Sequence, residues 1–324
     1  MTRPKSLIVA GLFVACLLIP LIVRADYNLQ VLFRVFLFAA LGLAWNLVGG
    51  YTGQLSLGHA AYFGAGAYAM ALLPPLGVSL WLAPVLGIIV AMAFAALIGG
   101  VSFRLRGPYF ALATIAFAEV LRLLAKNLPS VTGGDVGIQV PSLFAHAINR
   151  SFYFAAVVLT AIAFSVTVWV SRSKFGYYLM AIREDEDTAL SVGVNTARTK
   201  LEALFLSAGI TALGGALYGS LFLFIVPDQV LSLDISNEIA IVAMLGGAGT
   251  VLGPILGSIV LESASEVFKN VFHEAHLLIY GLLLVVVVMF LPEGIVGTVN
   301  SWLARRRATL GVAAKSQAQR NSTP

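Results

Sequence analysis

The chain has 324 residues, of which 59% are hydrophobic and only 11% are charged. Ordinary soluble domains carry about 25% charged residues and about half apolar ones, so a water-soluble core of this size is excluded. The formal net charge of +5 does not indicate nucleic-acid binding, because most lysines and arginines lie in short loops and near the two ends, where they set membrane topology. The composition predicts an all-α, polytopic bundle of transmembrane helices.

Apolar segments follow one another along the chain, each near the length of about 20 residues that a hydrocarbon core of about 30 Å requires. They are continuous rather than alternating, which excludes a transmembrane β-barrel. The predicted segments are 6–23, 29–48, 55–73, 80–103, 107–125, 151–171, 201–225, 239–248, 251–268 and 276–299. The first is longer than the apolar region of a signal peptide, so we expect an uncleaved helix. The predicted domains are a transmembrane part, 1–300, and a polar, disordered cytoplasmic tail, 301–324.

Basic residues orient these segments, since cytoplasmic loops of membrane proteins are enriched in lysine and arginine. They gather before the first segment, at Arg104 and Arg106, in the loop 172–200 and in the C-terminal tail. All four regions can face the cytoplasm only if the stretch 239–268 turns around within the membrane, as two short segments broken at residues 246–249. We therefore expect both termini in the cytoplasm.

Glycine interrupts one segment in each half of the chain, 55–73 and 239–268. This arrangement suggests an inverted repeat with broken or re-entrant helices, as many transporters have. Non-helical backbone survives in a membrane only where it is buried in protein or lines a cavity. The candidates for a translocation path are therefore Gln54, Ser56, Gly58, His59, Gly246, Gly247 and Gly249. A hydrogen-bonded packing role is favoured for His59 over a substrate contact. Glycines at 249, 253 and 257 predict a closely packed helix face.

Few ionisable residues lie inside the predicted segments, and each one costs about 3 kcal/mol at the centre of a bilayer. Glu119 and Arg122 are three positions apart on one helix, where they can neutralise each other. We favour a structural ion pair over a substrate role. The chain lacks the series of buried acids typical of a proton- or sodium-coupled carrier. It also contains no metal-ligand spacing, no catalytic constellation and no phosphate-binding G-x-x-x-x-G-K-[ST] motif, so we expect neither an enzyme nor a bound cofactor.

The loop 172–200 is the longest predicted cytoplasmic connection. Residues 181–193 within it predict one short helix, because acids in a first turn suit the helix dipole and Gly193 suits the end of a helix. Its residues fit a solvated surface helix and a helix that docks into a partner equally well. The residues concerned are Arg183, Glu184, Asp185, Glu186, Asp187, Ala189 and Gly193.

Several stretches of the sequence form a recognisable set: NLVGGYTGQLSLGHAA at 46–61, RLRGPYFALAT at 104–114, TGG at 132–134 and 181–195 with Lys200. LGGAGT at 245–250, GP at 253–254 and LPEG at 291–294 complete it. In these stretches the chain resembles the membrane permeases of branched-chain amino acid ABC importers, and it is similar to the longer, M-type, of the two paired permeases. The resemblance runs from about residue 37 to 299.

The resemblance implies a subunit of a bacterial inner-membrane importer. Its expected partners are a second, homologous permease in a heterodimer, two cytosolic ATPases that bind ATP, a periplasmic binding protein and membrane lipid. It also implies that 181–195 is the ATPase-coupling segment. The expected substrates are leucine, isoleucine and valine, although related permeases import urea, short amides and aromatic acids. The rival class is a secondary carrier or channel that works without ATP.

Overall fold

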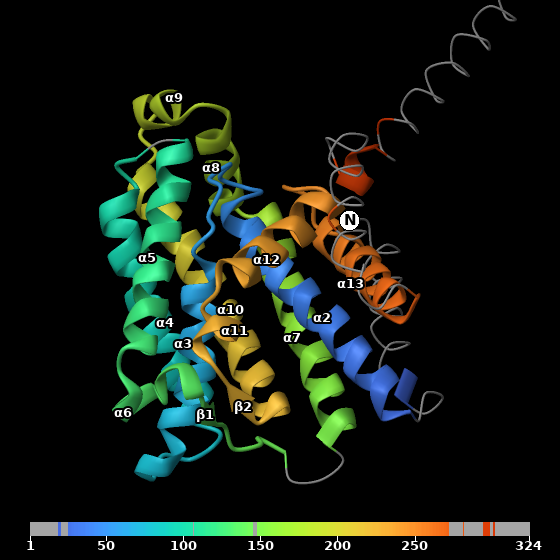
Figure 1. The fold of residues 1–324 in the computed structure, drawn as a ribbon. Helices are drawn as coiled ribbons and strands as arrows, with labels where there is room; N and C mark the ends of the chain where they lie inside the picture. Colours follow the sequence, from blue (N-terminus) through green and yellow to red (C-terminus); the bar gives the residue numbers. More distant parts are fainter. Residues whose placement is uncertain are drawn as a thin grey trace, which may run out of the picture.

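The computed structural model describes residues 19–20, 25–105, 107–144, 148–271, 281, 294–298 and 301, and it is a bundle of helices (Figure 1). Most of the predicted crossings 6–23 and 276–299, and the tail beyond residue 301, lie outside the described residues. In the part that is described, six helices are long and apolar enough to span a membrane: Asp26–Val48, Ala83–Ser102, Pro108–Lys126, Asn149–Arg172, Thr196–Phe222 and Pro227–Gly246. The predicted all-α transmembrane bundle is confirmed.

The long elements are α2 (Asp26–Val48), α4 (Ala83–Ser102), α5 (Pro108–Lys126), α7 (Ile148–Arg172), α10 (Thr196–Phe222) and α13 (Gly253–Val271). Two helices of 14 residues each, α3 (His59–Leu72) and α12 (Leu233–Gly246), are about half as long as α10. The short elements are η1 (Pro74–Leu76), α6 (Pro129–Thr132), η2 (Gly134–Val136), β1 (Ile138–Gln139), α8 (Lys174–Glu184), α9 (Glu186–Ser191), β2 (Phe224–Ile225) and α11 (Pro227–Val230). Strands β1 and β2 form one antiparallel pair, with Ile138 opposite Ile225.

The half-length helices reveal an inverted repeat. Each follows a long helix and a ten-residue segment, 49–58 before α3 and 223–232 before α12. Helices α2 and α10 lie side by side and run in opposite directions (Figure 1). Helix α4 packs on α3 and α10 in the same way as α13 packs on α12 and α2. The pairs α2–α10, α3–α12 and α4–α13 therefore correspond, which confirms the predicted inverted repeat with broken helices.

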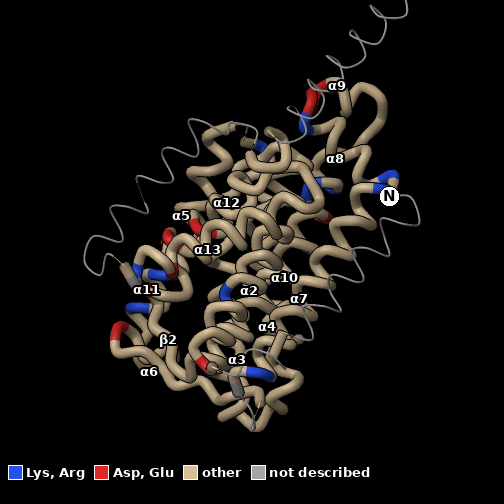
Figure 2. The backbone as a smooth tube through the Cα atoms, turned by 90° about the vertical axis from the view of Figure 1, so that its right-hand side faces the viewer, with Lys and Arg blue, Asp and Glu red and all other residues tan. Residues whose placement is uncertain are grey.

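The connections sort into two ends of the bundle. Arg183 of α8 contacts Gly50 and Gly249, and Lys200, which pairs with Glu186 of α9, lies over the Phe103 ring at the end of α4. Residues 49–53, 247–252 and the C-terminal end of α4 therefore lie beside α8 and α9, and we call this the α8–α9 end. η1, α6, β1 and β2 lie at the opposite end, the β1–β2 end (Figure 1). Charged positions are few along the tube; some lie near α9, others near α6 and α11, and a small number between these two ends (Figure 2).

Small residues let the central helices approach closely. Gly66 of α3 lies against the backbone carbonyl of Ala212 in α10, and Gly215 of α10 lies against that of Phe63 in α3, with no room for a Cβ atom at either glycine. Such contacts are how helices pack in a membrane, where no hydrophobic effect drives them together. Helix α3 is consequently buried along nearly its whole length, whereas α4, α5 and α7 expose broad apolar faces of the kind that lipid requires.

The second interruption differs in one respect from the prediction. The chain does double back at residues 247–252, since α12 and α13 pack against each other on either side of that turn. However, the counterpart of 49–58 is the segment 223–232, which contains no glycine, and Leu223 there adopts a positive φ of 63°. Gly249 has a φ of 81° in the turn, so it does not share a helix face with Gly253 and Gly257 as expected. Positive φ excludes it from a right-handed helix.

Candidate functional site

Arg183 and Asn46 join the two glycine-containing turns at the α8–α9 end. The Arg183 guanidinium, from α8, donates to the Gly50 carbonyl oxygen at 2.7 Å. The Asn46 side chain, from the end of α2, accepts from the Gly249 N–H at 2.7 Å and donates to the Thr250 carbonyl oxygen at 2.8 Å. We call these five residues the glycine hub. It ties α2 and α8 to the turn between α12 and α13.

Glycine is required at two hub positions by close approach. A Cβ atom on Gly50 would meet the Asn46 side chain and the Gly249 backbone, and one on Gly249 would meet the Arg183 guanidinium at 2.5 Å. Gly53, with a φ of 71°, lies against the aliphatic part of the same arginine. The predicted coupling residue Arg183 and the predicted path residue Gly249 are therefore direct neighbours.

The single helix predicted over 181–193 is wrong, because Asp185 divides it. Helix α8 ends at Glu184, and Asp185 has an extended backbone with φ −160° and ψ 116°. Its carboxylate accepts from the Thr188 N–H at 2.5 Å and so caps the N-terminus of α9. Asp and Asn are strongly favoured at this cap because they satisfy a backbone donor that the helix leaves free. The expected helix end is confirmed, since Gly193 follows α9 with a φ of 88°.

Lys200 fixes α9 to the bundle. Its ammonium group lies 2.5 Å from Glu186 Oε1, and its side chain is only 1% exposed. It also lies over the Phe103 ring, 5.7 Å from the ring centroid, at the end of α4. Ala189, on α9, is buried, whereas Leu190 and Val192 are exposed. The α8–α9 hairpin thus packs through one side and leaves apolar side chains on the other.

The segment that leads into α3 is held by side chains from several helices. Trp45 Nε1 donates to the Ser56 carbonyl oxygen at 2.7 Å, and the Leu57 N–H donates to Thr114 Oγ1 at 3.1 Å. His59 is fully buried, with Nε2 2.8 Å from Ser207 Oγ and Nδ1 3.3 Å from Ser56 Oγ. These bonds are those of a packed, hydrogen-bonded histidine that anchors the start of α3 to α10.

The remaining predicted path residues lie in different surroundings. Gly58 lies against the Thr114 backbone, and Gly246 against that of Gly253, where α12 and α13 meet. Gln54 is half-buried, and within the described part of the chain its Oε1 has no hydrogen-bond partner. A cavity of about 300 Å³ lies between α3, α4 and α5, and its lining residues include Tyr68, Leu121 and Leu231. None of the predicted path residues lines it.

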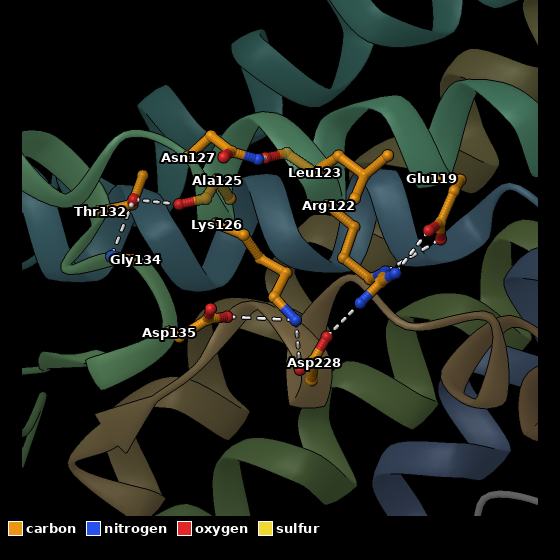
Figure 3. Close-up of polar contacts among 10 residues, drawn as sticks. All are labelled: Glu119, Arg122, Leu123, Ala125, Lys126, Asn127, Thr132, Gly134, Asp135 and Asp228. Carbon is orange, nitrogen blue, oxygen red and sulfur yellow. Dashed lines mark hydrogen bonds and ion pairs between the residues drawn. The ribbon is translucent and has the colours of Figure 1, made fainter.

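Glu119 and Arg122 belong to a larger charged network than the predicted pair (Figure 3). Arg122 donates to Glu119 from Nε at 2.9 Å and from Nη2 at 2.5 Å, and it also pairs with Asp228 of α11. Lys126 lies 2.9 Å from Asp228 and 3.1 Å from Asp135. The network joins the end of α5 to the segment before α12. Sequence reasoning missed Asp228 because it lies 106 positions from Arg122.

Comparison with known proteins identifies the chain. The family described as "Branched-chain amino acid transport system / permease component" matches residues 27–288. The chain belongs to this family. The high-affinity branched-chain amino acid transport system permease protein LivM of Escherichia coli is 30% identical to this permease, over 91% of this chain and 75% of LivM. LivM of Salmonella typhimurium is 29% identical over the same shares, and LivH of Escherichia coli is 24% identical over 80% of this chain and 91% of LivH.

These relatives confirm the resemblance to the M-type permease and place this chain among multi-pass membrane transport proteins. The matched region covers the glycine hub, both half-length helices and the α8–α9 hairpin. The structural features described above are therefore features of a branched-chain amino acid permease.

Replacing Arg183 by alanine should destabilise this permease. The Gly50 carbonyl would lose its charged donor, and a lost hydrogen bond to a charged group costs about 1.5–3 kcal/mol. The matched control is Arg198→Ala, which removes an exposed arginine that pairs with Glu202 on the surface of α10 and should cost under about 1 kcal/mol. Thermal unfolding of the purified protein in detergent measures both; equal melting temperatures for the two variants would contradict the hub.

Proposed function

We propose that this permease is a membrane subunit of an ATP-driven importer and forms part of the translocation path for leucine, isoleucine and valine. A periplasmic binding protein delivers the substrate. A second, homologous permease completes a heterodimeric core, and two cytosolic ATPases bind and hydrolyse ATP. Family membership supports the substrate class, and the lack of a phosphate-binding motif in this sequence supports separate ATPase chains. Permeases for urea, amides or aromatic acids are the alternative.

The observation that carries this proposal is the position of Arg183. It belongs to the exposed α8–α9 hairpin and at the same time contacts the segment before α3, at Gly50, and the turn after α12, at Gly249. A partner that moves the hairpin would therefore pull on the segment before α3 and on the turn after α12. Transmission of this kind needs packed groups with direct hydrogen bonds, which the glycine hub supplies. The α8–α9 hairpin is, in this proposal, the ATPase docking element.

The ATP requirement is tested by reconstituting the permease with its partner chains in proteoliposomes. Leucine uptake should depend on ATP and on the binding protein, and it should vanish with catalytically inactive ATPases, because this chain has no motif for binding nucleotide. The substrate class is decided by adding unlabelled competitors to the leucine uptake assay. Isoleucine and valine should inhibit leucine uptake, whereas urea and aromatic acids should not. Uptake driven by a proton or sodium gradient without ATPases would replace the importer by a secondary carrier.

The second part of the proposal is the orientation: the α8–α9 end and both termini face the cytoplasm. The basic loop 172–200 supports it. Val192 and Val136 are both exposed, the first beyond α9 and the second at the β1–β2 end. In a Cys16→Ser background, a membrane-impermeant maleimide added to spheroplasts should label Val136→Cys but not Val192→Cys. The reverse labelling pattern would contradict this orientation.

Docking itself is tested by removing exposed apolar contacts without breaking a helix. Leu190→Ala combined with Val192→Ala should weaken pull-down of the ATPases and lower uptake, since buried apolar side chains contribute about 1.5–3 kcal/mol each to a contact. Membrane abundance should stay unchanged because both side chains are on the surface. Val136→Ala, at the opposite end, is the control and should leave ATPase binding intact. Normal ATPase binding by the double variant would reduce the hairpin to a solvated connector.

A further inference from the structure

Three charged side chains meet where α2, α12 and α13 pack against one another. Arg34 is the ninth residue of α2, Glu238 the sixth of α12 and Glu262 the tenth of α13, so all three lie well away from the ends of their helices. Arg34 Nε lies 3.3 Å from Glu262 Oε2, and Arg34 Nη2 lies 3.5 Å from Glu238 Oε1. We call these three residues the Arg34 cluster. Glu238 falls one residue outside the predicted segment 239–248, so the sequence alone did not reveal the cluster.

The Arg34 cluster holds two carboxyl groups and only one cationic side chain. Both carboxyl groups lie against the same guanidinium group, and ionised carboxylates only accept hydrogen bonds. The Glu262 side chain is only 4% exposed, and its Oε1 atom has no hydrogen-bond partner among the residues that the structure describes. A buried acceptor without a donor is unfavourable, and a buried charge without a partner more so. The cluster therefore has a place for one more proton or for one cationic donor.

Lys269 does not fill that place. It lies seven residues beyond Glu262 on α13, a rise of about 10 Å along the helix, which is too far for a direct hydrogen bond. Lipid tails carry no donor either. The other two members of the cluster are accessible, since the side chains of Arg34 and Glu238 are 30% and 25% exposed. A polar ligand can thus reach the carboxyl pair from the side of Arg34 and Glu238.

We propose that Glu238 and Glu262 receive the α-ammonium group of the transported amino acid, and that Arg34 beside them receives its α-carboxylate. The proposal rests on the proposed function. An ammonium group has three donors, enough to bridge both carboxyl groups and to supply Glu262 Oε1 with the hydrogen it lacks. A guanidinium group has five N–H donors, so the two glutamates leave some free for a substrate carboxylate. A zwitterion would then meet complementary charges at both ends.

The position of the Arg34 cluster fits this use. Glu238 projects from α12, one of the two half-length helices, and transporters bind substrate near the bilayer midplane beside such discontinuous helices. Two apolar side chains border the cluster: the Phe38 ring lies 6.0 Å from the guanidinium and is itself buried, and the partly exposed Ile241 follows Glu238 by three residues on α12. Of these two, Ile241 is the one that the aliphatic side chain of a substrate can contact.

The test removes the ammonium group from the ligand or one carboxylate from the protein. The complete complex in nanodiscs, with partner permease and ATPases, is titrated with radiolabelled leucine and with radiolabelled 4-methylpentanoate, which has the same skeleton without the amino group. The unaltered complex should bind leucine about tenfold or more tightly than the analogue, as expected for a charged hydrogen-bonded contact. Glu262→Gln and Glu238→Gln should each abolish this preference and leave binding of the analogue unchanged or stronger.

Glu266→Gln is the control, one turn further along α13, where the carboxylate accepts from Tyr27 at the surface; it should keep the full preference. If the Arg34 cluster only held the helices together, each glutamine variant would weaken the binding of both ligands by the same factor. That result would overturn the proposal. So would a preference for leucine that persists in both variants, or one that is missing in an unaltered complex that does import leucine. Failure of ATP-driven leucine uptake by the unaltered complex would instead contradict the proposed function.

Discussion

Backbone groups inside a membrane must find hydrogen bonds within the protein, and this requirement organises the bundle around the start of α3. The N–H groups of residues 49, 50 and 52 still bond to carbonyls four positions earlier, but the chain beyond Thr52 leaves the helical ladder, so side chains have to replace it. Trp45 of α2, Thr114 of α5 and Ser236 of α12 each bond one backbone group between Ser56 and Ala60. Three helices are thereby positioned by one short segment, and the close approach of Gly58 to the Thr114 backbone follows from the same bonds.

The same requirement applies at the turn between α12 and α13. The side-chain amide of Asn46 bonds one backbone donor, the Gly249 N–H, and one backbone acceptor, the Thr250 carbonyl, of that turn. Arg183 donates to the Gly50 carbonyl of the neighbouring turn. Asn46 belongs to both turns, since its backbone carbonyl accepts from the Gly50 N–H at 3.0 Å while its side chain bonds the turn between α12 and α13, so a shift of one turn strains the bonds of the other. Local satisfaction of backbone groups thus produces a mechanical link between the α8–α9 hairpin and the two halves of the repeat.

The sequence predicted the long helices well, because a continuous apolar run of about 20 residues matches the length of a helix that crosses the hydrocarbon core. It failed where the structure depends on contacts between distant residues. The break at 223–232 contains no glycine, and its irregular backbone is held partly by the β1–β2 pair. Asp185 was assigned to the first turn of a helix because acids are favoured there, whereas it caps the next helix. Asp228 and Glu238 pair with arginines more than 100 positions away.

The network of Arg122 and Lys126 and the Arg34 cluster each contain one carboxylate more than they have cations. Burial decides what this excess means in each case. The network of Arg122 and Lys126 joins three carboxylates to two cations, but Asp135 and Asp228 are largely exposed and need no further partner. The Arg34 cluster also has one acid more than its cations, and there Glu262 is buried with an oxygen left unpaired within the described part of the chain. Water can solvate the extra charge in the first case. In the second case only a proton or a ligand can do so, which is why the same charge imbalance indicates an anchor near the β1–β2 end and a binding site where α2, α12 and α13 meet.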